Sequence, residues 1–335
     1  KESDIDAFRR QLELPIEFND LIIPMRVFFA HLNCPSDGDT TEEVFRKINI
    51  LSDESKQHDH WLIAFREEME TKYLRRLTII TELKKVLTDN QSELSMVYQP
   101  KINLQTNNVC SVEALIRWNS QRLGFIPPDE FIEIAEQAGF IEQVTDWVLN
   151  RVVADILILR EHQIYIKPAV NLSTQDIQNR PLLERLIALL EANGLSANDI
   201  TLEITESDLV ADAKIAIANL QFLQDKGFGI AIDDFGTGYS SLAYLKNLPV
   251  SAIKIDKAFV LNLSTDTDDQ QIVHTVLSLS NIFDLEVVAE GVEDANAMEI
   301  LADWGCDTAQ GYYISRPLPL NGLIEWLAAS EYYQH

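Results

Sequence analysis

The chain has 335 residues, with 27 Lys and Arg against 53 Asp and Glu and a formal net charge of −26 at pH 7. This balance argues against a nucleic-acid polymer as partner, because such binding needs a basic surface. No stretch is long and apolar enough to cross a membrane, so we expect a soluble segment without membrane contact.

The cysteines Cys34, Cys110 and Cys306 lie far apart and form no CxxC pair. Their odd number and wide spacing argue against a disulfide framework and predict a reducing, cytoplasmic compartment. The chain starts at Lys1 with no charged-then-apolar leader. We therefore expect a fragment of a longer protein, and we leave an upstream sensor or membrane anchor open.

Residues 1–65 predict a partial α/β segment. Residues 23–32 have the composition of a strand, residues 34–39 that of a turn, and residues 41–51 that of a helix capped by Thr40 or Thr41. One strand and one or two helices cannot close a good core alone. Residues 66–90 predict a connecting helix, because apolar residues recur every three or four positions. A core-facing helix of the next domain explains the same stripe equally well.

Strand-like and helix-like patterns alternate over residues 91–335, which predicts a mostly parallel sheet. Eight strands over this length match a (β/α)8 barrel. Only residues 101–109 separate the first two strands, too few for a parallel crossover, so we expect an antiparallel hairpin there. The sequence therefore predicts a modified TIM barrel with one reversed strand. The predicted strands are 94–100, 110–118, 166–172, 200–205, 228–233, 252–256, 285–290 and 307–311.

Nearly every predicted barrel strand carries an acid, an amide or a cation at or near its end. In parallel barrels these ends form the active-site face. Oxygen ligands without Cys or His favour Mg²⁺ or Mn²⁺ over Zn²⁺. The adjacent Asp233 and Asp234 suit two metals bridged by one carboxylate, an arrangement typical of phosphodiester cleavage. Each residue alone fits a helix cap, a turn or a surface ion pair, but their coincidence favours a metal site. The residues are Glu113, Asn171, Glu203, Asp233, Asp234, Lys254, Asp256, Glu290 and Gln310.

The stretch DDFGTGYSS, residues 233–241, follows one of these strands. Its small and hydroxyl-bearing residues allow a mobile loop that approaches a ligand closely. The stretch lacks the spacing and the lysine of a Walker phosphate loop. We interpret it as a loop ordered by the metals and by Glu206.

Over residues 91–335 the sequence resembles the EAL-domain cyclic di-GMP phosphodiesterases. The signature tripeptide is Glu113-Ala114-Leu115. Around it stand YQP (98–100), NLS (171–173), LEITES (202–207), IKID (253–256), AEGVE (289–293) and QGYYISRPLP (310–319). Residues 1–65 resemble the C-terminal half of a GGDEF-type cyclase domain, although the GGDEF string is absent, so we expect no cyclase activity.

The resemblance implies a role for each site residue. Glu113, Asn171, Glu203 and Asp233 would bind one metal, and Asp233 with Asp234 the second. Lys254 would contact the attacking water and the scissile phosphate, Glu290 would be a ligand or base, and Glu206 would brace the loop. Glu293 and Gln310 would support ligands and waters. Substrate contacts would come from Gln99 to a guanine, Arg117 to a phosphate, and Asp256.

The reaction implied by the resemblance is hydrolysis of cyclic di-GMP to linear pGpG by a water that two Mg²⁺ or Mn²⁺ ions activate, in a homodimer. Two alternatives stay open. One is a catalytically silent receptor for cyclic di-GMP, against which the complete ligand set argues. The other is a two-metal barrel hydrolase that acts on a different phosphodiester.

Overall fold

The computed structural model describes residues 2–18, 21–58, 61–89, 91–205, 213–236, 245 and 248–333. The chain divides into two compact units, Lys1–Thr81 and Glu82–His335. Helix α3 (Glu67–Thr88) begins in the first unit and ends in the second. None of the helices in the described ranges is long and apolar enough to span a membrane.

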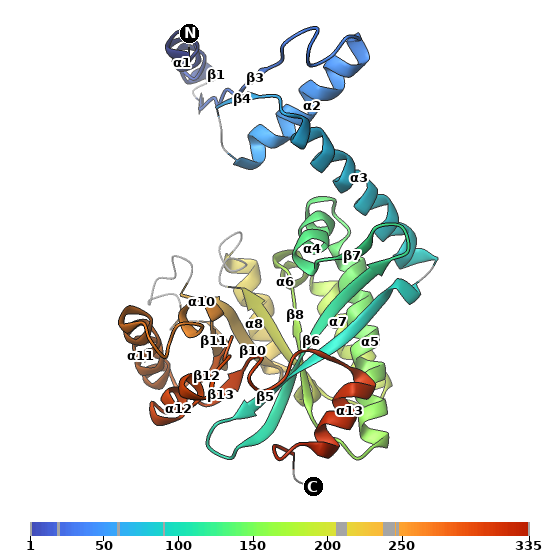
Figure 1. The fold of residues 1–335 in the computed structure, drawn as a ribbon, viewed down its shortest axis with the longest axis vertical. Helices are drawn as coiled ribbons and strands as arrows, with labels where there is room; N and C mark the ends of the chain where they lie inside the picture. The colour runs from blue at the N-terminus through green and yellow to red at the C-terminus, as the bar shows by residue number, and fades with distance from the viewer. Residues whose placement is uncertain are drawn as a thin grey trace. The chain divides into compact units, whose positions relative to one another are not determined.

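The second unit is a closed eight-stranded barrel (Figure 1). Strand β5 pairs antiparallel with both of its neighbours, β6 and β13, whereas the remaining strands pair in parallel. The predicted hairpin and reversed strand are thus confirmed. The barrel strands are β5 (Leu94–Asn103), β6 (Asn108–Ser120), β8 (Lys167–Asn171), β9 (Thr201–Thr205), β10 (Gly229–Phe235), β11 (Ala252–Ile255), β12 (Glu286–Ala289) and β13 (Thr308–Gln310). Short strands β7 (Gly124–Ile126) and β14 (Leu318–Pro319) add to β6 and β5.

Helices follow the strands because caps and apolar stripes specify them. Helix α5 (Ile141–Glu161) buries Val144, Val148 and Val152, one residue per turn, and packs against β5 and β8. Asp294 caps α12 (Ala295–Asp303) by accepting a hydrogen bond of 2.8 Å from the Ala297 backbone N–H. The other helices of this unit are α4 (Pro128–Gln137), α6 (Thr174–Gln178), α7 (Arg180–Ala192), α8 (Ala213–Asp225), α10 (Lys257–Val260), α11 (Thr267–Phe283) and α13 (Leu320–Ala329), with 3₁₀ turns η1 (Gln91–Glu93) and η2 (Ala197–Asp199).

The first unit has a small core of its own, formed by Ile50, Leu51, Ile63 and Met69. The predicted strand over residues 23–32 is shorter in the structure. Only Phe29–His31 (β3) pairs with β4, because β4 (Leu62–Ala64) is itself three residues long. The remaining elements are α1 (Glu2–Leu12), the antiparallel strands β1 (Ile16–Phe18) and β2 (Leu21–Ile23), and α2 (Thr41–His58).

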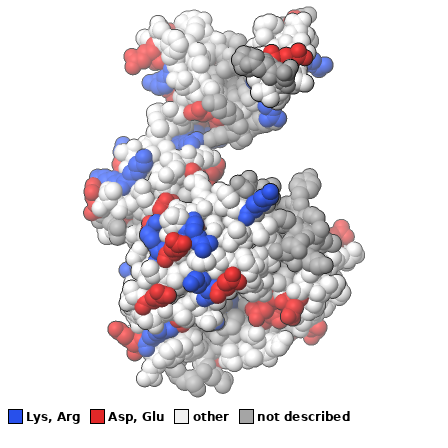
Figure 2. All heavy atoms as spheres, turned by 180° about the vertical axis from the view of Figure 1, so that it is seen from behind, with Lys and Arg blue, Asp and Glu red and all other residues white. Residues whose placement is uncertain are grey.

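Acidic and basic side chains are interspersed on the face shown in Figure 2. Ion pairs between surface side chains also occur among the described residues. Arg185 donates to Glu142 at 2.6 Å and lies 3.1 Å from Asp146, for example. The described part of this face therefore presents mixed charge rather than a separate basic patch.

Candidate active site

The period-two alternation of the barrel strands places charged side chains inside the barrel. In β11, Lys254 lies between Ile253 and Ile255, which point to the opposite side, toward the helices. In β9, Glu203 alternates in the same way with apolar neighbours. The register aligns Asn171 of β8 with Glu203, and Gln99 of β5 with Glu113 of β6. Residues distant in sequence thus converge at one level of the barrel.

Four buried charges form what we call the floor of the site: Lys101, Glu113, Glu203 and Lys254. The Lys254 ammonium lies 2.8 Å from Glu203 Oε2, and the Lys101 ammonium donates to the other oxygen of the same carboxylate. Lys254 is 0% exposed, Glu203 1% and Lys101 3%. Both oxygens of Glu203 therefore contact a cation, which compensates for their removal from water.

Three carboxylates form what we call the rim: Asp233, Asp234 and Glu290. Lys254 Nζ lies 2.7 Å from Asp233 Oδ2 and 2.7 Å from Glu290 Oε1. A bulge between Ile232 and Phe235 of β10 contains both aspartates, and Asp234 has a left-handed φ of 54°. Such bulges redirect side chains beside active sites. Here it places two consecutive carboxylates at the mouth of the barrel.

The floor and the rim differ in the pKa values of their carboxyl groups. Burial raises the pKa of Glu113, but Lys254 and Lys101 outweigh it and hold that pKa at about 2. Burial raises the pKa of Glu290 to about 8, and the charges of Asp233 and Glu113 add to the rise. Burial also raises the pKa of Asp234 to about 6, with contributions from Asp233 and Asp256. Full ionisation of the rim would therefore create more negative charge than the protein's own cations offset.

The carboxylates form two groups that could each hold a metal ion. Glu113, Glu203 and Asp233 make one group, and Asp233, Asp234 and Glu290 make the other. Within each group one oxygen from every residue lies within 4.8 Å of the others. An all-oxygen donor set with raised rim pKa values fits hard divalent cations.

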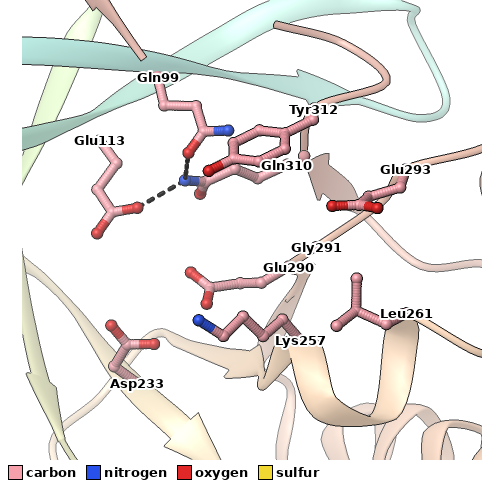
Figure 3. Close-up of a pocket in the computed structure, with 11 residues that line it drawn as sticks. Gln99, Glu113, Asp233, Lys257, Leu261, Glu290, Gly291, Glu293, Gln310 and Tyr312 are labelled. Atoms are coloured by element: carbon pink, nitrogen blue, oxygen red, sulfur yellow. Dashed lines mark hydrogen bonds between the residues drawn. The ribbon is translucent and has the colours of Figure 1, made fainter. Parts of the chain in front are cut away.

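Amide side chains fix the Glu113 carboxylate from two sides. Asn171 Nδ2 donates to Glu113 Oε1 at 3.0 Å, and Gln310 Nε2 donates to Glu113 Oε2 at 2.6 Å. The same Gln310 nitrogen donates to Gln99 Oε1 at 3.0 Å, as Figure 3 shows. Gln99 in turn donates to the backbone carbonyl of Ser315 at 3.0 Å. This chain of hydrogen bonds orients Glu113 toward the rim.

A cavity of about 400 Å³ lies beside the floor, the rim and the amide side chains (Figure 3). Six of the residues predicted from sequence line it: Gln99, Glu113, Asp233, Glu290, Glu293 and Gln310. The others that line it are Lys257, Leu261, Gly291, Gly311 and Tyr312.

Arg117 and Asp256 do not line the cavity, although Asp256 lies beside Asp234 of the rim, and Glu206 lies outside the described part. The half-buried Arg117 does not line the cavity, and its guanidinium donates to the Ile116 carbonyl at 2.8 Å. Asp256 caps α10 by accepting from the Ala258 backbone N–H at 2.9 Å. Glu206 and residues 237–241 of the predicted loop lie outside the described residues.

The sequence reading missed Lys101, Lys257 and Tyr312. A signal for Lys101 was present, since it stands two positions after Gln99 and therefore on the same face of β5. A lysine at such a position in a buried strand needs a carboxylate partner, here Glu203. Lys257 and Tyr312 stand just after strand ends, where sequence gives no sign of which way a side chain turns.

The family model for the EAL domain matches residues 81–317. The chain belongs to the EAL-domain family. It is 32% identical over 319 residues to the cyclic di-GMP phosphodiesterase PA2567 of Pseudomonas aeruginosa, covering 95% of this chain and 54% of that protein. It is 36% identical over 323 residues to the cyclic di-GMP phosphodiesterase NbdA of the same organism, covering 96% of this chain and 41% of that protein.

Among solved structures, a c-di-GMP complex of the PaMucR phosphodiesterase is similar to this chain. It has a TM-score of 0.69 and 37% sequence identity, and the match covers 73% of this chain and 99% of that one. The chain spans about half the length, or less, of the two curated relatives. The similarity thus includes most of this EAL-domain chain but only part of those proteins.

Proposed function

We propose that this chain hydrolyses cyclic di-GMP to linear pGpG in a site that holds two Mg²⁺ or Mn²⁺ ions. The observation that carries the proposal is the pair of carboxylate groups that share Asp233 beside the 400 Å³ cavity. The phosphodiesterase names of the relatives and the c-di-GMP in the complex of PaMucR support the choice of substrate.

In this proposal the two carboxylate groups each hold one cation. Glu113, Glu203 and Asp233 would hold the first, with Asn171 beside them. Asp233, Asp234 and Glu290 would hold the second. When bound, such cations supply Lewis-acid stabilisation of phosphoryl oxygens and a more acidic water.

The protein's own residues would orient the reactants and move the proton. Lys254 is fixed among four carboxylates, with its ammonium 2.7 Å from both Asp233 and Glu290, so it would hold the metal-binding carboxylates in place. Its contact with the attacking water and the scissile phosphate stays a prediction of the family resemblance. Glu290 lines the cavity with one carboxylate oxygen 2.7 Å from Lys254, so it is placed to act as a ligand or as the base that accepts a proton from the attacking water.

The remaining roles are proposed on the same basis. Gln99 and Glu293 line the cavity and would contact the substrate or its waters, while Gln310 holds Glu113 and Gln99 in place. A phosphate contact by Arg117, loop bracing by Glu206, substrate binding by Asp256 and a homodimer stay predictions of the family resemblance. A cytoplasmic location stays a prediction from the number and spacing of the cysteines. The division into residues 1–65, 66–90 and 91–335 stays a prediction as well.

Chromatography of cyclic di-GMP incubated with the protein tests the proposal. Reactions would contain Mg²⁺, Mn²⁺ or EDTA, and we expect pGpG only with a metal. Asp233→Ala should abolish cleavage, because this carboxylate belongs to both groups. Glu286→Ala is a matched control, since Glu286 is an exposed carboxylate at the far end of β12.

The other outcomes separate the alternatives. Intact cyclic di-GMP that nevertheless binds to the protein would indicate a receptor and overturn the proposed hydrolysis. Cleavage of other cyclic or linear dinucleotides at equal rates would overturn the substrate assignment. Full activity of Asp233→Ala would overturn the metal assignment.

A further inference from the structure

Lys257 is the cation that lines the cavity in the described part of the structure. It is the first residue of α10, directly after the cap residue Asp256. Its side chain is exposed, and Figure 3 shows it extending into the cavity toward Glu290. A cation that faces a cavity walled by carboxylates reduces the repulsion that an anionic ligand meets there.

The other lysines of the site are held in a different way. Lys101 and Lys254 are buried, and both contact Glu203. For Lys257, the structure shows no ion pair within the described ranges. A long, exposed lysine of this kind can move to a ligand without first breaking a buried salt bridge. Lys257 is therefore suited to contact a ligand, whereas Lys101 and Lys254 are suited to fix carboxylates.

The fold brings the backbone of Lys257 close to the cavity wall. Gly291 follows β12 with a left-handed φ of 72°. A Cβ atom at this glycine would lie 2.6 Å from Lys257 Cβ and 3.1 Å from its Cα. Only glycine therefore permits both this backbone conformation and this approach. The close approach brings the start of α10 to the same wall of the cavity as Glu290 and Gly291.

We propose that Lys257 is a phosphate-binding residue of this cavity, whose ammonium contacts a phosphodiester oxygen of the anionic ligand. The proposal rests on the proposed function and adds a recognition residue to it. Cyclic di-GMP carries two phosphodiester charges. The divalent cations proposed for the rim and the Lys257 ammonium can therefore each contact a phosphate oxygen. A charge-assisted hydrogen bond of this kind strengthens ligand binding before the chemical step.

Steady-state kinetics on cyclic di-GMP with Mg²⁺ test the proposal through Lys257→Met, Lys257→Arg and Lys167→Met. Lys167→Met is the matched control, because Lys167 is an exposed lysine at the opposite end of β8 from Asn171. We expect Lys257→Met to raise KM about tenfold, with kcat changed by less than about twofold. The rise of KM with added salt should become shallower. Lys257→Arg and Lys167→Met should both keep KM and kcat near the wild-type values.

Three results would overturn the proposal: an unchanged KM in Lys257→Met, an equal rise in Lys167→Met, or a raised KM that keeps the wild-type salt dependence. The last result would indicate a structural role.

If the wild type leaves cyclic di-GMP intact, the proposed function fails, and calorimetric titration of intact cyclic di-GMP then measures the same contact. Affinity about tenfold weaker in Lys257→Met alone would support the role of Lys257 in a receptor. Equal affinities, or no binding to the wild type, would overturn it.

Discussion

The floor and the rim of the site contain the same kinds of charged groups but balance them differently. On the floor, Glu203 is 1% exposed and contacts two lysines. On the rim, the Glu290 side chain is 17% exposed and shares Lys254 with three other carboxylates. The floor is neutralised by the protein itself, whereas the rim needs charge from outside. The floor carboxylates therefore stabilise the barrel in addition to belonging to the first carboxylate group, whereas the rim carboxylates depend on a bound cation or ligand for charge balance.

The strongest test of this comparison removes a floor carboxylate. Glu203→Ala leaves Lys101 and Lys254 buried with fewer partners, and breaking a buried pair in this way costs about 3–5 kcal/mol. We therefore expect the free energy of unfolding in urea to fall by about that amount, together with loss of cleavage. Glu286→Ala makes the same charge change at an exposed site and should leave stability nearly unchanged. Equal stability of Glu203→Ala and the wild type would contradict the structural role of the floor.

Removing a rim charge should slow cleavage without lowering the stability of the fold. Burial, with help from Asp233 and Glu113, disfavours the charged form of Glu290, so a neutral Glu290→Gln side chain relieves that cost. We expect cleavage to slow about a hundredfold, because a proton acceptor is lost. Thermal unfolding in EDTA should occur at the same temperature as in the wild type or higher. A large loss of stability in Glu290→Gln would show that rim and floor do not differ.

Divalent cations should stabilise the fold through the rim. At a free concentration ten times the dissociation constant, one bound Mg²⁺ or Mn²⁺ raises the free energy of unfolding by about 1.4 kcal/mol. We expect thermal unfolding to shift upward with either metal and to return with EDTA. In Asp233→Asn the shift should shrink, since this residue belongs to both carboxylate groups. The same shift in Asp233→Asn as in the wild type would place the metals elsewhere.

The barrel could be predicted from sequence because its signals are local. Strand and helix patterns alternate, and the short connection over residues 101–109 specifies the antiparallel pairing of β5 and β6. The first unit was predicted less well. Its strands β1 to β4 have three residues each, so their pairing depends on tertiary contacts rather than on a sequence pattern.

In the site, too, the features that depend on tertiary contacts could not be predicted from the sequence. Residues at or just after strand ends, such as Asn171 and Glu290, could be placed on one face from topology alone. The bulge that sets Asp234 at a φ of 54° could not, because a bulge is a matter of register between β10 and β11. The direction of Lys257 depends on its close approach to Gly291, which becomes visible only after folding.

The thiol of Cys306 reports on the barrel wall at the end of β12 that lies away from the site. Burial raises the pKa of this thiol to about 12, and its Sγ lies 3.5 Å from the carbonyl of Val287 in β12. At pH 8 almost none of it is thiolate, so a thiol reagent should label the exposed Cys34 and Cys110 and leave Cys306 unreacted. Glu290→Gln should label like the wild type, because the rim change leaves the wall closed. Glu203→Ala should label Cys306 roughly a hundredfold faster, in proportion to more frequent opening of the barrel. Equal labelling rates in the two variants would mean that floor and rim stabilise the barrel alike, whatever their difference in charge.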